Sequence, residues 1–303
     1  MSPNPPGRSA WPELRFAEWR DSGATLQLWT QIVGKLRLAL SPWLNHGWQV
    51  PLYVSARGLG SSAMHVGGGR LVEVEFDLVD HRLVIRSSDA AEHGFALAPM
   101  SVAAFYRRFM AEIAAIGIHV AINVRPNEVA DPIPFPDDET HAAYDPAAVH
   151  TVWRALVQAD RVFRHFRSGF LGKASPVHLF WGAFDLAVTR FSGKRAPERP
   201  EADGMTREAY SHEVISHGFW PGSGPVQEAA FYAYSAPPPD GLAQAKVEPA
   251  AAGWSTELGE FILPYEAVRQ SGDPEAALTA FLETTYDAGA RLAGWNRDEL
   301  ERR

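Results

Sequence analysis

The segment HLFWGAFDLAVTR, from His178 to Arg190, constrains the fold more than any other part of the chain. It is almost wholly apolar and aromatic, which predicts a strand over 180–190 that lies inside the protein. Yet Asp185 stands in its middle, and burying a carboxylate costs several kcal/mol unless a partner offsets that cost. We therefore expect a polar arrangement around this strand.

Length and charge narrow the class of protein. The chain has 303 residues, more than one hydrophobic core usually spans, so two halves are expected. Its 36 Asp and Glu residues outnumber its 28 Lys and Arg residues, which gives a net charge of −8. This balance argues against binding to nucleic acid or to anionic membranes, because both need clusters of basic residues. A small molecule is the partner we expect, and the oligomeric state stays open.

The chain contains no cysteine, which excludes disulfides, thiolate metal ligands and a cysteine nucleophile and fits a reducing compartment. The N-terminal MSPNPPGRSA lacks the apolar core of a signal peptide. No run of about 18 apolar residues exists to span a membrane. We expect a cytoplasmic protein.

A Pro-rich, acidic segment at 126–144 divides the chain. It separates a first half at 11–125 from a second half at 145–303, and residues 1–10 are expected to form a disordered tail. Because proline stiffens a chain, we expect this segment to be an extended linker.

Each half combines helical and strand patterns, which predicts an α+β fold of mainly antiparallel sheets with packed helices. In the first half, helices are expected at 25–40 and after the N-cap Ser101, and strands at 48–57, 71–79, 82–86, 95–98 and 119–124. In the second half, helices are expected at 149–170 and after Asp273-Pro274, and strands at 180–190, 209–216, 228–235 and 261–264.

The two halves share an order of residues that indicates an internal duplication. In each half the order is Gly-Lys, Ser-Pro, Trp and then a strand. The first series is Gly34-Lys35, Ser41-Pro42 and Trp48, and the second is Gly172-Lys173, Ser175-Pro176 and Trp181. This match would pair Leu52 with Leu186. The alternative is two unrelated halves, because glycine at a helix end is a general feature.

Several segments resemble an uncharacterised bacterial family, a domain of unknown function. They are WPELRFAEWRDSGATLQLWTQIVGK, DHRLVIRSSD, DPIPFPDDETHAAYDP, SPVHLFWGAFDLAVTRFSGKRAP, REAYSHEV and LGEFILPYEAVR. The resemblance covers nearly the whole chain and implies a bacterial, stand-alone protein. It implies no activity, so it carries no catalytic residue over to this sequence.

Three polar side chains on otherwise apolar strands are the first candidates for a site: His178, Asp185 and His212. Arg190, Glu213 and Tyr232 are second choices. Alternation along a strand over 180–190 puts Ala183, Ala187 and Thr189 on the Asp185 face, which leaves room for a ligand, and puts Phe180 and Arg190 on the other face.

These residues allow more than one chemistry. Two histidines and a carboxylate are a recognised ligand set for zinc or iron, so His178 and His212 with Asp185 or Glu213 could hold a divalent metal, although no spacing is diagnostic. The preferred interpretation is hydrogen-bonded polar groups, with Asp185 paired to an Arg or to a helix N-terminus. The spacing of His212 and His217 excludes the zinc-protease motif, which needs histidines at i and i+4 on a helix.

Two functions of different class follow. The first is a small-molecule-binding protein or enzyme with a His/Asp cluster in the second half, where a carboxylate serves as base and a histidine as acid, base or ligand. The second is a non-catalytic interaction module that uses an aromatic surface around Trp220. A deep cleft with convergent polar groups favours the first, and a flat aromatic patch favours the second.

Overall fold

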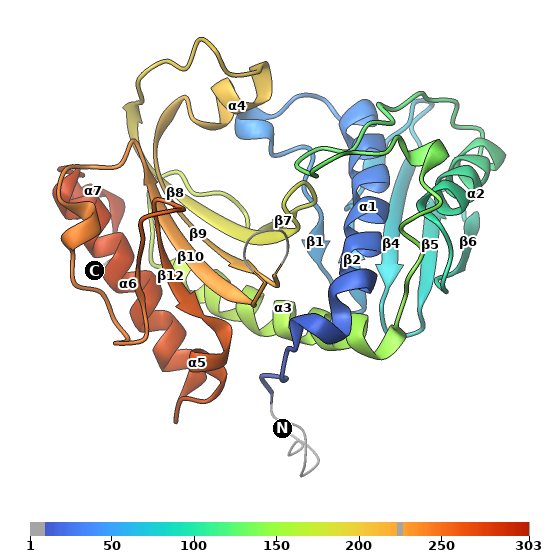
Figure 1. The fold of residues 1–303 in the computed structure, drawn as a ribbon. Coiled ribbons are helices and arrows are strands. Elements are labelled where there is room, and N and C mark those ends of the chain that lie inside the picture. Colours follow the sequence, from blue (N-terminus) through green and yellow to red (C-terminus); the bar gives the residue numbers. More distant parts are fainter. Residues whose placement is uncertain (1–9, 223–226, 303) are drawn as a thin grey trace.

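The computed structural model describes residues 10–222 and 227–302 and has the α+β architecture expected from the sequence. Two antiparallel sheets of six strands each stand in two halves, and helices pack on both (Figure 1). Residues 1–9 of the expected tail lie outside the described residues.

The first half places a long helix and a shorter one on its sheet. Helix α1 (Phe16–Leu40) is buried along most of its length, and α2 (Val102–Ala115) begins where the Ser101 hydroxyl accepts a hydrogen bond from the Ala104 amide. The sheet runs β1-β2-β4-β5-β6, with β3 beside β4. Its strands are β1 (Tyr53–Val54), β2 (Gly58–Gly60), β3 (Met64–His65), β4 (Leu71–Asp77), β5 (Arg82–Ser87) and β6 (Glu92–Ala96).

The second half also packs helices on a six-stranded sheet, but it contains more helices. Its sheet runs β11-β12-β10-β9-β8-β7. The strands are β7 (His178–Phe180), β8 (Asp185–Arg195), β9 (His212–Trp220), β10 (Ala230–Ala236), β11 (Gly253–Ser255) and β12 (Glu260–Pro264). The helices are α3 (Pro146–Ser168), α4 (Gly204–Ala209), α5 (Tyr265–Arg269), α6 (Pro274–Leu292) and α7 (Arg297–Leu300). As expected, Asp273 caps α6, and Asp145 caps α3 in the same way.

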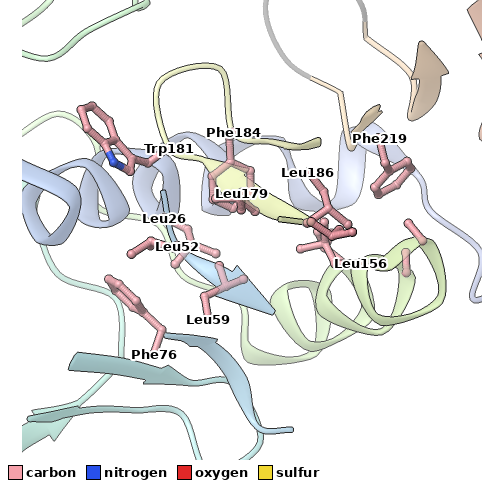
Figure 2. Close-up of a cluster of buried hydrophobic side chains, with 14 of the residues drawn as sticks. Leu26, Leu52, Leu59, Phe76, Leu156, Leu179, Trp181, Phe184, Leu186 and Phe219 are labelled. Carbon is pink, nitrogen blue, oxygen red and sulfur yellow. The ribbon is translucent and has the colours of Figure 1, made fainter. Parts of the chain in front are cut away.

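The two sheets meet at their first strands. Leu52, directly before β1, and Leu179 in β7 exchange two backbone hydrogen bonds of 2.9 and 2.7 Å. Helix α3 runs beneath both sheets (Figure 1). Apolar side chains from both halves surround this joint, so one continuous core holds the halves together (Figure 2). They include Leu26, Leu59 and Phe76 from the first half and Leu156, Leu186 and Phe219 from the second.

The strand expected over 180–190 is a hairpin. Strand β7 ends at Phe180, residues 181–184 turn, and Phe184 takes a positive φ of 59°. Phe180 therefore pairs with Asp185 across the hairpin and shares its face, which corrects the expectation that the two face apart. Alternation within β8 still keeps Ala187 and Thr189 on the Asp185 face, as predicted.

Other expected strands are shorter or absent. Of the strand expected at 48–57, only Tyr53–Val54 is extended in the sheet, and residues 119–124 form no strand. The segment 126–144 folds back on the first half, since Phe135 and Asp138 are buried and Asn127 exchanges hydrogen bonds with Gln31.

The expected match between Leu52 and Leu186 is wrong. Leu52 stands before the edge strand β1 and bridges Leu179 in the edge strand β7, whereas Leu186 lies in β8, the second strand of its sheet. In each half, a long helix precedes a sheet whose first strand in the chain is an edge strand. The two halves do not share the expected match between Leu52 and Leu186.

We expect Leu179→Ala to lower the free energy of unfolding by about 2–5 kcal/mol, because it opens a cavity at a fully buried joint. Since the core is continuous, both halves should lose stability in one transition. Urea unfolding, followed by tryptophan fluorescence and by far-UV circular dichroism, measures this. The exposed Leu171→Ala is the matched control, and separate transitions in the two probes would contradict the shared core.

Candidate functional site

A cavity of about 560 Å³ lies between the second sheet and the C-terminal part of α1. It opens on the sheet face opposite to α3 and α6, which pack on the other face. Polar and aromatic side chains from both halves line it, among them Lys35, Glu128, His178, Phe180, Asp185, Thr189, Ser216, Tyr232 and Tyr234.

Asp185 and Tyr232 form the polar pair at this wall. Asp185 begins β8 and is 8% exposed, and Tyr232 in β10 donates its hydroxyl hydrogen bond to Asp185 Oδ2. Strand β9 lies between them, and there Gly218 stands directly opposite Tyr232. A Cβ at Gly218 would collide with the Tyr232 ring and hydroxyl. The missing side chain therefore lets the tyrosine reach across β9 to the carboxylate.

The electrostatics around Asp185 are unusual for a buried acid. Desolvation and, to a smaller extent, the negative charge of Glu128 raise the pKa of Asp185 to about 6, although the Tyr232 hydrogen bond opposes them. Within the described residues, no cationic side chain contributes to this shift. The expected partner, an Arg or a helix N-terminus, is thus replaced by a tyrosine hydroxyl.

Hydroxyl groups continue along the same face of the sheet. The Tyr232 ring stacks on Tyr234 with centroids 6.1 Å apart, and the Tyr234 hydroxyl lies 3.0 Å from the Tyr210 hydroxyl. Thr189 Oγ1 and Ser216 Oγ are 2.9 Å apart. These groups satisfy one another and give the cavity a wall of donors and acceptors.

The facing wall comes from the first half. Lys35 of α1 donates to Arg125 O at 2.8 Å and to Asn127 Oδ1 at 2.5 Å, and burial lowers its pKa to about 8. The Glu128 carboxylate lies against Gly182, where a Cβ would collide with it. The sequence interpretation missed Lys35 and Glu128 because both lie outside the second half.

His178 also lines the cavity. It pairs with Ala187 on the Asp185 face and is 1% exposed. Its Nδ1 has no hydrogen-bond partner. Burial, with the charges of Arg37 and Arg167, lowers the pKa of His178 to about 3, so its imidazole is neutral at neutral pH.

The structure does not bring His212 to His178 and Asp185. His178 pairs with Ala187, which faces Gly218 of β9, and His212 pairs with Arg195. Eight residues of the bulged β8 and six residues of β9 therefore separate the two histidines, roughly 20–26 Å at 3.3 Å each. The His212 Nδ1 lies 3.0 Å from its neighbour Ser211 Oγ. Two of the three first candidates thus share the cavity, and the third lies at the far end of the sheet.

Of the second choices, Tyr232 is in the cavity, whereas Arg190 and Glu213 are not. Arg190 lies on the opposite face, 2% exposed, with its guanidinium carbon 3.4 Å from the Phe166 ring centroid and 4.3 Å from that of Tyr286. This arrangement makes it a core residue. Glu213 accepts a hydrogen bond from Ser192 Oγ at 2.8 Å.

The metal hypothesis required His178, His212 and a carboxylate to converge. Over residues 10–222 and 227–302, no three His, Asp or Glu side chains are grouped so that they could hold a metal ion. His178 and His212 cannot share a metal ion because of the distance between them along β8.

Fold and cavity together define an α+β protein whose second sheet and helix α1 enclose a polar, aromatic pocket. The chain belongs to the family of unknown function DUF5996, whose model matches residues 11–302. This confirms the family resemblance found in the sequence. No curated protein and no solved structure matches the chain. In the described part of the chain, every helix is too short or too polar to cross a bilayer.

We expect Asp185→Asn to stabilise the protein at pH 8 by about 2–3 kcal/mol. The folded-state pKa of Asp185, about 6, exceeds the unfolded value of about 3.9. Above pH 6 the folded state therefore carries the full cost of a desolvated carboxylate, and this cost disappears as the pH falls from 6 to 4. The amide keeps the acceptor for Tyr232 and removes the charge.

Urea unfolding of parent and variant between pH 4 and pH 8 measures this difference. The stabilisation should vanish toward pH 4, and the exposed Asp240→Asn should show none of it. An Asp185→Asn protein that is less stable at pH 8 would contradict the assignment of an uncompensated acid.

A second prediction concerns the reach of Tyr232. Gly218→Ala should displace the tyrosine and Tyr232→Phe should delete its hydroxyl, so either change should raise the pKa of Asp185 above about 6. Carbon-detected NMR titration of the carboxyl group measures this shift. Gly253→Ala is the control, since a Cβ at this glycine of the same sheet meets nothing within 4 Å. An unchanged pKa in both test variants would exclude the hydrogen bond as a determinant.

Proposed function

We propose that this protein binds a small molecule in the cavity between its halves, with Asp185 and Tyr232 as the central polar pair. The observation that carries the proposal is a buried acid–tyrosine pair on the wall of a cavity of about 560 Å³. That volume is in the range of small-molecule sites, which are mostly apolar with a few convergent polar groups. The net charge of −8 also favours a small molecule over nucleic acid.

The same pair supports a role in proton transfer. With a pKa of about 6, the Asp185 carboxyl can both accept and donate a proton near neutral pH, as general acid–base catalysis requires. Buried acids with shifted pKa values in a cavity are typical of functional sites. Binding is the first step of the proposal, and acid–base chemistry at Asp185 is the reaction class that would follow if the protein is an enzyme.

No observation favours the interaction module. Phe219 is fully buried and Trp220 partly buried in β9, and residues 223–226 of the adjoining loop lie outside the described residues. The exposed Trp43 donates its Nε1 hydrogen bond to Glu208 Oε2 at 2.6 Å. The aromatic side chains of the second half point to a lined cavity and not to a flat patch.

The test fills the cavity and asks whether binding is lost. The purified protein is incubated with a bacterial metabolite extract, and compounds that stay bound after gel filtration are identified by mass spectrometry. We expect one compound class to be enriched by the parent and lost in Thr189→Phe, because a ring at position 189 occupies the cavity. The exposed Thr140→Phe should bind like the parent. If the parent enriches nothing over Thr189→Phe, the proposed function is excluded.

A further inference from the structure

We propose that the ligand of this cavity is an organic cation, with an ammonium group that docks on Asp185 between aromatic rings. This inference rests on the proposed function and adds the chemical class of the ligand. Three features carry it: an acid without a counter-charge, rings beside that acid, and a buried imidazole that supplies no positive charge.

The first feature is the charge of the sheet face. Asp185 has Tyr232 as its side-chain partner, and no ion pair joins it to a cation in the described residues. The acids Glu128, from the first half, and Glu260, from β12, act on the same region, since Glu128 raises the pKa of Asp185 and Asp185 raises that of Glu260. Buried carboxylates in proteins are normally paired with a cation. In this cavity a bound ligand would supply that cation.

The second feature is the aromatic lining. Phe180 stands directly across the hairpin from Asp185, so their Cβ atoms are about 4.5–5.5 Å apart on one face. The stacked rings of Tyr232 and Tyr234 follow on β10, and Trp181 lines the cavity beside the hairpin turn. Ring faces attract cations, and more strongly where water is excluded. A carboxylate flanked by rings favours an ammonium group, which gains from both the negative charge and the ring faces, whereas a neutral polyol gains only hydrogen bonds to the carboxylate.

The third feature is His178. Its ring is buried, its centroid lies 4.6 Å from that of the Phe180 ring, and it lines the cavity. Because this imidazole is neutral at neutral pH, it adds no positive charge to the wall that carries Asp185. A cation beside Asp185 therefore has to come from a ligand.

The cation already in the wall does not fill this role. Lys35 stands on α1, and its ammonium is engaged by Arg125 O and Asn127 Oδ1. It is held by the first half and not by Asp185. The Asp185 carboxylate therefore remains available to pair with a cationic ligand.

The experiment compares three probes that share one ring and differ in charge: benzylammonium, benzyl alcohol and benzoate. Calorimetry at pH 8 should show benzylammonium bound at least roughly tenfold more tightly than the other two, as expected for a charge-assisted hydrogen bond. Asp185→Asn should remove that preference, whereas the exposed Asp240→Asn should keep it. Near pH 6, in buffers of different ionisation enthalpy, benzylammonium binding should release protons and benzyl alcohol binding should not.

The outcomes separate this inference from the proposed function. If the compound lost in Thr189→Phe is neutral or anionic, or if benzyl alcohol binds as tightly as benzylammonium, the cavity binds a ligand but the cation assignment is overturned. If neither the extract nor any probe gives binding that Thr189→Phe removes, the proposed function itself fails. A cationic compound whose affinity drops tenfold or more in Asp185→Asn supports both.

Discussion

The backbone pairing of Leu52 with Leu179 is the constraint on which the rest of the structure depends. It joins the edge strands of the two sheets, and the apolar side chains around it merge two cores into one. Close by, the Trp181 indole donates to Val50 O at 2.9 Å, and Gln27 of α1 donates to Gly182 O. These contacts hold the end of the β7–β8 hairpin against α1. The two walls of the cavity are held together at this joint and again at the other end of the cavity, where His46 Nδ1 lies 3.0 Å from Glu208 O.

The buried carboxylate of the candidate site lowers the stability of the fold. The fold places a carboxylate in an apolar strand and gives it a tyrosine hydroxyl from two strands away instead of a cation. This arrangement needs Gly218 in the intervening strand, because any side chain would close the path. On the opposite face of the same sheet, Arg190 is held by aromatic rings and a backbone carbonyl. The contrast separates a polar residue built into the core from one that lines the cavity.

Local patterns predicted most of the elements correctly, because they depend on nearest neighbours in the chain. The alternation in β4 and the caps at Ser101 and Asp273 gave the expected strand and the expected helix starts. The hairpin at 178–195 was missed because its turn at 181–184 is apolar, and Gly182, the one turn signal in the run, also suits a bulge within a strand. The start of α1 was placed too late because this helix is buried on several sides and lacks a single apolar stripe.

The sequence by itself determined that a buried acid needs a partner. It also determined that Ala187, Thr189 and Tyr232 lie on strand faces made of polar or small side chains, since strand alternation is a local property. Only the tertiary structure decided which residues meet. It brought Glu128 and Lys35 to the cavity from another half, and it set His212 roughly 20–26 Å from His178. Sheet register and the joint between the sheets fix these distances, which spacing along the chain does not contain.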